Sequence, residues 1–204
     1  MGLAQRGYQC TGQDFTPGRV EITKKRAARS NVSLDTGQGD ATKLRFDQDF
    51  DAVLALNVLF LLPSDEDVSK CIAGARAALR PGGVFVCNIF NALATGRSDA
   101  RKYLNGEHTV SESKGRGIRL TAIEELKHYD PVLGAGWVHT TTMVEAPDGG
   151  HIFRDKERVR FFTYWDITHF TGQAGFKETS SYPDWKAKPA KKPLANDLVF
   201  IARK

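Results

Sequence analysis

The stretch SDEDVSKCIAGARAALRPGGVFVCNIF, residues 64–90, predicts a helix, a stop and then a buried strand. Ser64 followed three residues later by Asp67 is a helix-capping pattern. The apolar residues then recur at helical spacing on one face, formed by Val68, Ile72, Ala75 and Leu79. The run Pro81-Gly82-Gly83 predicts the end of the helix, and the apolar run VFVCNIF that follows is typical of a strand covered on both faces.

The segments before residue 64 repeat this alternation of strand and helix. Residues 8–14 suit a short strand, and residues 16–30 suit a helix with Thr16 as N-cap and Pro17 at the first helical position. Residues 31–44 suit a second short strand with a turn rich in Gly and Asp. The nearly continuous apolar run at residues 50–62 predicts a strand buried on both faces at the centre of a sheet. The pattern predicts an α/β fold in which helices cover both faces of an open parallel sheet.

The pattern changes at residues 91–160, where longer stretches alternate between polar and apolar residues and PDGG at 147–150 marks a tight turn. These features favour antiparallel hairpins, inserted before the last helix. That helix is expected at residues 163–175, with Thr163 and Asp166 as its capping residues and Gly175 at its end. Two strands, at residues 176–182 and 197–203, are expected to close the chain.

Composition indicates one globular domain spanning the 204 residues. No run of about 18 apolar residues is present and the first residues lack a secretory signal, so we expect a cytoplasmic protein without membrane contact. The three cysteines, Cys10, Cys71 and Cys87, have no metal-binding spacing and are expected to be reduced core residues. Much of the net charge of +5 lies in the lysine-rich residues 186–193, which favour a solvated loop over nucleic-acid binding.

Several short motifs, taken in order, resemble the class I S-adenosylmethionine-dependent methyltransferases. They are the acid at the end of the first strand, GDA at 39–41, LALNVLFLL at 54–62, LRPGG at 79–83, and the final helix followed by AGF at 174–176 and two strands. The resemblance covers nearly the whole chain. It implies a Rossmann-like, mostly parallel sheet with an antiparallel last strand pair, an antiparallel insertion at residues 91–160 that folds over the site, and S-adenosylmethionine bound at the carboxyl ends of the strands.

The resemblance also implies which residues of this chain contact the cofactor. Asp14 would hold the two ribose hydroxyls and Phe15 would lie against the adenine. Asp40 would accept the adenine amino hydrogen while the backbone of Ala41 serves a ring nitrogen. Leu56 and Asn57 would line the pocket near the methionine part. Structural roles stay open for each: Asp14 as an acid at a helix entry, Phe15 as a core aromatic, and Asp40 and Asn57 as turn formers.

One part of the family pattern has no counterpart in this sequence. In the family, a central first strand and a glycine-rich turn precede the first strand of this chain and wrap the methionine part of the cofactor. We therefore expect an N-terminally truncated methyltransferase-like domain, completed by upstream sequence or by a partner chain or oligomer. Two alternatives stay open: a degenerate, non-catalytic methyltransferase that acts as a binding module, and an NAD(P)-dependent oxidoreductase whose strand-end acid binds a ribose.

The acceptor of the methyl group is expected to be a small molecule, and no metal is required. Candidate contacts are the aromatic residues and histidine of the insertion and last helix, namely Tyr129, Trp137, His139, Tyr164 and Trp165. His139 and His169 are the candidate general bases, although each is also compatible with a structural role. The sequence identifies no catalytic residue.

Overall fold

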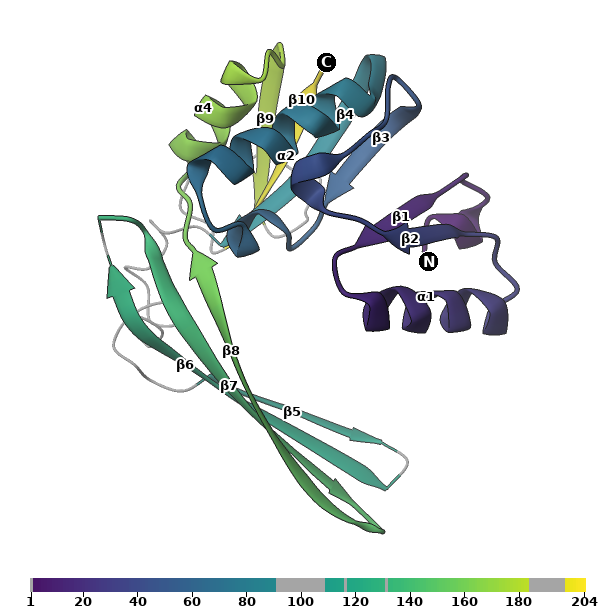
Figure 1. Cartoon of the computed structure of the whole chain (residues 1–204), viewed down its shortest axis with the longest axis vertical. Coiled ribbons are helices and arrows are strands. Elements are labelled where there is room, and N and C mark those ends of the chain that lie inside the picture. The colour runs from purple at the N-terminus through teal and green to yellow at the C-terminus, as the bar shows by residue number, and fades with distance from the viewer. Residues whose placement is uncertain (1, 91–108, 116, 131, 184–196) are drawn as a thin grey trace.

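The computed structural model describes residues 2–90, 109–115, 117–130, 132–183 and 197–204. The described chain forms three β-sheets and three α-helices (Figure 1). The first part of the chain contains η1 (Ala4–Arg6), β1 (Thr11–Asp14), α1 (Pro17–Arg29), β2 (Asp35–Gln38), η2 (Ala41–Lys43), β3 (Phe50–Ala55), η3 (Leu59–Leu61) and α2 (Asp65–Ala78). The second part contains β4 (Leu79–Phe90), β5 (Thr109–Gly115), β6 (Ile118–Asp130), β7 (Ala135–Ala146), β8 (Gly149–Arg160), α4 (Tyr164–Gln173), β9 (Glu178–Pro183) and β10 (Asp197–Arg203).

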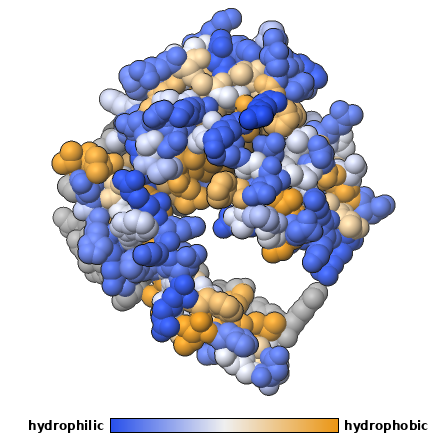
Figure 2. Space-filling view, in the orientation of Figure 1, coloured by the Kyte–Doolittle hydropathy of each residue, from blue (hydrophilic) through white to orange (hydrophobic). Residues whose placement is uncertain are grey.

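The N-terminal unit consists of the parallel pair β1–β2 and the helix α1. Thr16 is the N-cap of α1 and Pro17 its first residue, as the sequence predicts. Val20 and Ala27 are the buried residues of this helix. The unit lies beside β3 in Figure 1, but among the described residues no hydrogen-bonded strand joins β1 to β3. Figure 2 shows an opening at the centre of the molecule, with hydrophobic residues along part of its upper rim.

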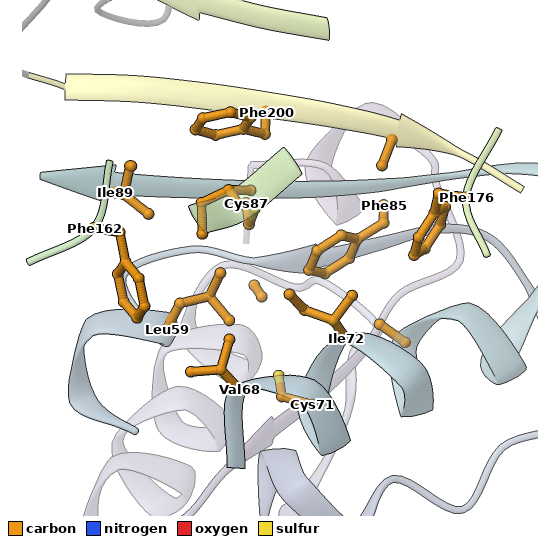
Figure 3. Packing of buried hydrophobic residues seen from close by; sticks show 14 of the residues in the cluster. Leu59, Val68, Cys71, Ile72, Phe85, Cys87, Ile89, Phe162, Phe176 and Phe200 are labelled. Atoms are coloured by element: carbon orange, nitrogen blue, oxygen red, sulfur yellow. The ribbon is translucent and has the colours of Figure 1, made fainter. Parts of the chain in front are cut away.

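The second sheet has the order β3-β4-β10-β9. The pair β3–β4 is parallel, whereas β10 runs antiparallel to both β4 and β9, so the reversed strand near the end of the chain is confirmed. Side chains of β4 and β10 meet those of α2 in the main core (Figure 3), and Ile167 of α4 belongs to the same cluster. Its largest fully buried members include Phe85, Phe162, Phe200, Leu59 and Ile72. Removal of this apolar surface from water is the principal term that stabilises the sheet against the two helices.

Both core helices begin with the predicted caps. The Ser64 hydroxyl accepts the N–H of Asp67 at 3.1 Å. Thr163 and Asp166 form a complete capping box, in which the backbone N–H of Thr163 donates to the Asp166 carboxylate at 2.6 Å. Each such cap contributes about 1 kcal/mol to helix stability, because it satisfies donors that the helix itself leaves unpaired.

The third sheet is antiparallel, with the order β5-β6-β7-β8, and it projects from the rest of the molecule in Figure 1. We call β5–β8 the arm. The predicted tight turn joins β7 to β8, and the predicted hairpins are present. At its base the arm buries Leu126, Val138 and Val159, and Phe60 from η3 packs against this cluster as well as against the main core. Arg158 donates to the carbonyl of Pro63 at 3.0 Å, and Arg160 forms an ion pair with Asp65.

The prediction for residues 50–62 is wrong in two respects. The strand ends at Ala55, and among the described residues β3 lies at the edge of its sheet, where Leu54 is 44% exposed. The chain turns at Asn57, whose φ is +56°, and Leu59 then enters the core from the short helix η3. The apolar run is therefore one strand followed by a core-packed turn, which periodicity alone does not distinguish from one long strand.

Candidate cofactor site at the strand ends

The six predicted cofactor residues all lie where a strand ends. Asp14 is the last residue of β1 and Phe15 follows it, Asp40 lies between β2 and η2, Ala41 is the first residue of η2, and Leu56 and Asn57 follow β3. Because β1 is parallel to β2 and β3 is parallel to β4, the members of each pair end at the same edge. Carboxyl ends of parallel strands are the usual ligand edge of open α/β sheets.

Asp14 is half-buried, and one oxygen of its carboxylate already accepts a hydrogen bond within the fold. Its Oδ1 accepts the backbone N–H of Thr16 at 2.8 Å, a contact that fixes the entry into α1. Among the described residues, no hydrogen-bond partner is found for its Oδ2. The structural role that the sequence left open is thus present, and it leaves acceptor capacity on the same carboxylate.

Apolar side chains beside these strand ends are open to solvent. Phe15 is 73% exposed, so the alternative reading of this residue as a core aromatic is wrong. Its carbonyl accepts a hydrogen bond from the Gln38 side chain at 3.1 Å, which ties the end of β1 to the end of β2. Leu56 is 39% exposed. Exposed aromatic and aliphatic groups beside free polar groups are what a binding site for a partly apolar ligand requires.

Asp40 caps the short helix η2. Its Oδ1 accepts both the backbone N–H of Thr42 at 2.9 Å and the Thr42 hydroxyl at 2.7 Å, and Lys43 lies 3.2 Å from Oδ2. The hydrogen bonds from Thr42 hold the pKa of Asp40 below its usual value, and Lys43 contributes in the same direction. Asp40 is therefore an ionised acceptor, but it is more fully engaged than Asp14. Ala41 is the first residue of η2 and is half-buried.

Asn57 forms a reciprocal pair with Asn88, a residue that sequence reasoning did not identify. The N–H of Asn57 donates to Oδ1 of Asn88 at 2.8 Å, and Nδ2 of Asn88 donates to Oδ1 of Asn57 at 2.7 Å. Asn57 is exposed, whereas Asn88 is only 4% exposed. The signal in the sequence was one amide within the apolar run VFVCNIF, because a buried amide must find partners.

The predicted acceptor residues fall in different environments. Trp137 and His139 lie on one face of the arm beside a shallow depression of about 410 Å³, which is lined by His139, Arg154, Asp155 and Lys156. Lys156 lies 5.6 Å from the centre of the Trp137 ring, in a cation–π arrangement.

The other acceptor candidates lie at the arm base and in α4. Tyr129 packs edge-on against Phe161 beside the cluster at the arm base, and burial together with Asp130 raises its pKa. Tyr164 packs against the main core, whereas Trp165 and His169 are exposed. These residues do not form one cluster with the six at the strand ends.

The part of the chain that the structure describes contains neither a candidate metal site nor a helix that could span a membrane. Within it, no group of three or more His, Cys, Asp or Glu side chains could hold a metal ion. No helix there is long and apolar enough to cross a membrane. The three cysteines are free, and Cys71 and Cys87 are buried.

Comparison with known proteins agrees with this picture. A family model described as a methyltransferase domain matches residues 1–87. A ubiquinone biosynthesis O-methyltransferase of Paramagnetospirillum magneticum is 33% identical over 92 residues. That match spans 45% of this chain and 36% of the relative, so it covers about a third of that protein's length.

Solved structures share the fold over most of the chain. An S-adenosylmethionine-dependent methyltransferase from Clostridium acetobutylicum has a TM-score of 0.78 at 11% identity, and covers 96% of this chain and 75% of its own. The CcbJ methyltransferase from Streptomyces caelestis has a TM-score of 0.76 at 20% identity, with 98% and 76% covered. Residues 1–87 match the methyltransferase-domain family, and the fold of nearly the whole chain, including the reversed strand β10, is similar to that of solved S-adenosylmethionine-dependent methyltransferases.

Proposed function

We propose that this chain binds S-adenosylmethionine at the ends of β1, β2 and β3 and serves methyl transfer to a small-molecule acceptor. The observation that carries the proposal is Asp14, a carboxylate at the end of a parallel strand with one oxygen committed to the fold and the other without a partner among the described residues. A carboxylate in that position can accept hydrogen bonds from the two hydroxyls of a ribose.

The remaining strand-end residues supply complementary contacts in this proposal. The exposed ring of Phe15 offers a stacking surface for adenine. Ionised Asp40 accepts an amino hydrogen, and the backbone of Ala41 serves a ring nitrogen. Leu56 and Asn57 line the methionine end. The bound cofactor supplies an activated methyl group, which an acceptor atom attacks in line as the carbon–sulfur bond breaks.

Because the sulfonium is already activated, the protein's contribution is alignment and exclusion of water. A general base is required only for an acceptor that carries a proton at the attacking atom. We propose that the arm provides the acceptor side of the site, with the depression beside His139 and Trp137 as its candidate surface. The curated relative is an O-methyltransferase and one solved neighbour is a sugar N-methyltransferase, so oxygen and nitrogen acceptors are both reasonable.

The facing edges of β1 and β3 support a further part of the proposal. Each of these strands has a hydrogen-bonded neighbour on one side only among the described residues. We propose that a further parallel strand, from a longer form of this protein or from another chain, pairs with both edges and completes the site. In this proposal residues 1–204 form one domain, and residues 91–160 are an insertion within it. We also propose a cytoplasmic location.

The separation of β1 from β3 also favours a second candidate function. If no strand fills the gap, the chain is a non-catalytic binding module that presents these edges to a partner. A nicotinamide-dependent oxidoreductase is the third candidate, since a strand-end acid also suits the ribose of NAD.

Calorimetric titration of the purified chain with S-adenosylmethionine, S-adenosylhomocysteine and NADH separates the three candidates. The proposal predicts saturable binding of the first two and none of NADH. Binding of NADH alone would favour the oxidoreductase. If none of the three compounds binds, and none binds to a form of the chain that carries an added strand, the proposal is contradicted. The binding module is then the remaining candidate. Transfer of labelled methyl groups to catechol and amino-sugar acceptors then tests activity directly.

A further inference from the structure

The amide of Asn88 occupies an unusual place for a polar side chain. Asn88 lies in β4 between Cys87 and Ile89, which are both fully buried, and it is itself 4% exposed. A buried amide without partners is costly, so its contacts indicate what the side chain is for. Both of the hydrogen bonds found for this side chain go to one residue, Asn57.

The pair stands at the point where the strand ladder ends. Backbone pairing between β3 and β4 stops at Ala55 and Cys87. Beyond it, Oδ1 of Asn88 accepts the N–H of Asn57, so a side chain continues the ladder where the backbone of β3 leaves it. The second hydrogen bond, from Nδ2 of Asn88 to Oδ1 of Asn57, fixes the Asn57 side chain as well.

The turn at Asn57 has a strained backbone and determines where the following residues pack. Asn57 has a φ of +56°, a left-handed conformation that residues other than glycine seldom adopt, although asparagine tolerates it best. The turn directs the chain into η3, where Leu59 enters the main core and Phe60 packs against the cluster at the arm base. The conformation at Asn57 thus determines both the position of the exposed end of β3 and the contact of η3 with the base of the arm.

We propose that Asn88 is a positioning residue that locks the Asn57 turn, so that the end of β3 and the base of the arm keep the geometry of the binding site. The lock is a property of the fold, and only its effect on S-adenosylmethionine rests on the proposed function. Asn88 touches Asn57 and acts on a ligand through it.

The test uses the full chain and measures amide hydrogen exchange by NMR together with affinity for S-adenosylmethionine by calorimetry. Asn88→Leu removes both hydrogen bonds and keeps the number and branching of the non-hydrogen side-chain atoms, and Asn88→Asp keeps an acceptor for the Asn57 N–H but no donor. Asn57→Asp retains both hydrogen bonds, because its carboxylate still accepts from Nδ2 of Asn88. Val86→Ala is the matched control, since Val86 lies two residues away on the same strand and shares its face.

We expect Asn88→Leu to accelerate exchange of the Asn57 N–H by about tenfold or more, the equivalent of one hydrogen bond, while Val86→Ala does not. Asn57→Asp should retain the protection, and Asn88→Asp should retain part of it. Affinity for S-adenosylmethionine should fall by about tenfold in Asn88→Leu and much less in Val86→Ala.

Unchanged exchange at Asn57 in Asn88→Leu would overturn the proposal, as would an equal loss of affinity in Val86→Ala. If the unaltered chain binds no S-adenosylmethionine, the proposed function fails, but the exchange measurement still decides the role of Asn88.

Discussion

Replacement of Asp14 is the sharpest test of the site, because the structure separates its two roles. Oδ1 of Asp14 accepts the Thr16 N–H at 2.8 Å, whereas Oδ2 has no partner among the described residues. Asp14→Asn retains one oxygen for Thr16 and loses the charge and one acceptor. We therefore expect its free energy of unfolding to stay within about 0.5 kcal/mol of the unaltered chain. Asp14→Ala also loses the contact at the helix entry and should cost about 1 kcal/mol.

The two variants should differ from the unaltered chain much more in binding than in stability. A hydrogen bond to a charged group is worth about 1.5–3 kcal/mol, so loss of one such bond to a ribose hydroxyl weakens binding by roughly 10- to 150-fold. Asp14→Ala loses both bonds and should show no measurable binding. Calorimetric titration with S-adenosylhomocysteine gives the affinity, and urea unfolding gives the stability of the same samples.

Asp35→Asn is the matched control for this experiment. Asp35 is exposed and begins β2, opposite Thr11 at the amino end of the same two-stranded sheet, so the charge change is identical and the position is not. Its affinity should stay within a factor of about two of the unaltered chain, because an exposed charge at that distance is screened by salt. Equal affinity of Asp14→Asn and the unaltered chain, or an equal loss in Asp35→Asn, would refute the assignment of Asp14 to the ribose.

Three further predictions concern the fold that carries the site. Thr163→Ala removes the capping box of α4 and should lower the free energy of unfolding by about 1 kcal/mol in urea titration; a change below about 0.3 kcal/mol would contradict the role of the cap. Burial raises the pKa of Cys71 to about 11, so its contribution to stability is full below its ordinary value near 9 and is lost as pH rises toward 11. The decline in thermal midpoint across that range should be shallower in Cys71→Ala. Phe60→Ala should detach the arm base at a cost of about 1–2 kcal/mol, since Phe60 is only half-buried, and should speed proteolysis within β6–β8. Leu61→Ala, in the same turn but 37% exposed and outside both clusters, should not.

Local signals in the sequence were strong enough to place most elements. The caps at Ser64 and Thr163 depend on residues three positions apart, and the hairpin β7–β8 depends on alternation around one tight turn. Such features involve residues that are close together in the chain, so they can be predicted without knowledge of the fold. The strand-end position of Asp14 belongs to the same class, because it needs only the end of a strand and the start of a helix.

Tertiary structure decided what the local pattern left ambiguous. Apolar residues 50–62 are compatible with one long strand, and only packing of Leu59 into the core shows that the chain turns at Asn57. The partnership of Asn57 with Asn88 joins residues that are 31 positions apart, and no sequence period reports a contact of that range. The sequence by itself placed the helix caps at Ser64 and Thr163 and the acid at the end of β1, since each of these features arises from residues near one another in the chain. Only the tertiary structure decided that the chain turns at Asn57, that Phe60 joins the arm to the core, and that a buried amide holds the turn, because these depend on surfaces that meet only once the chain has folded.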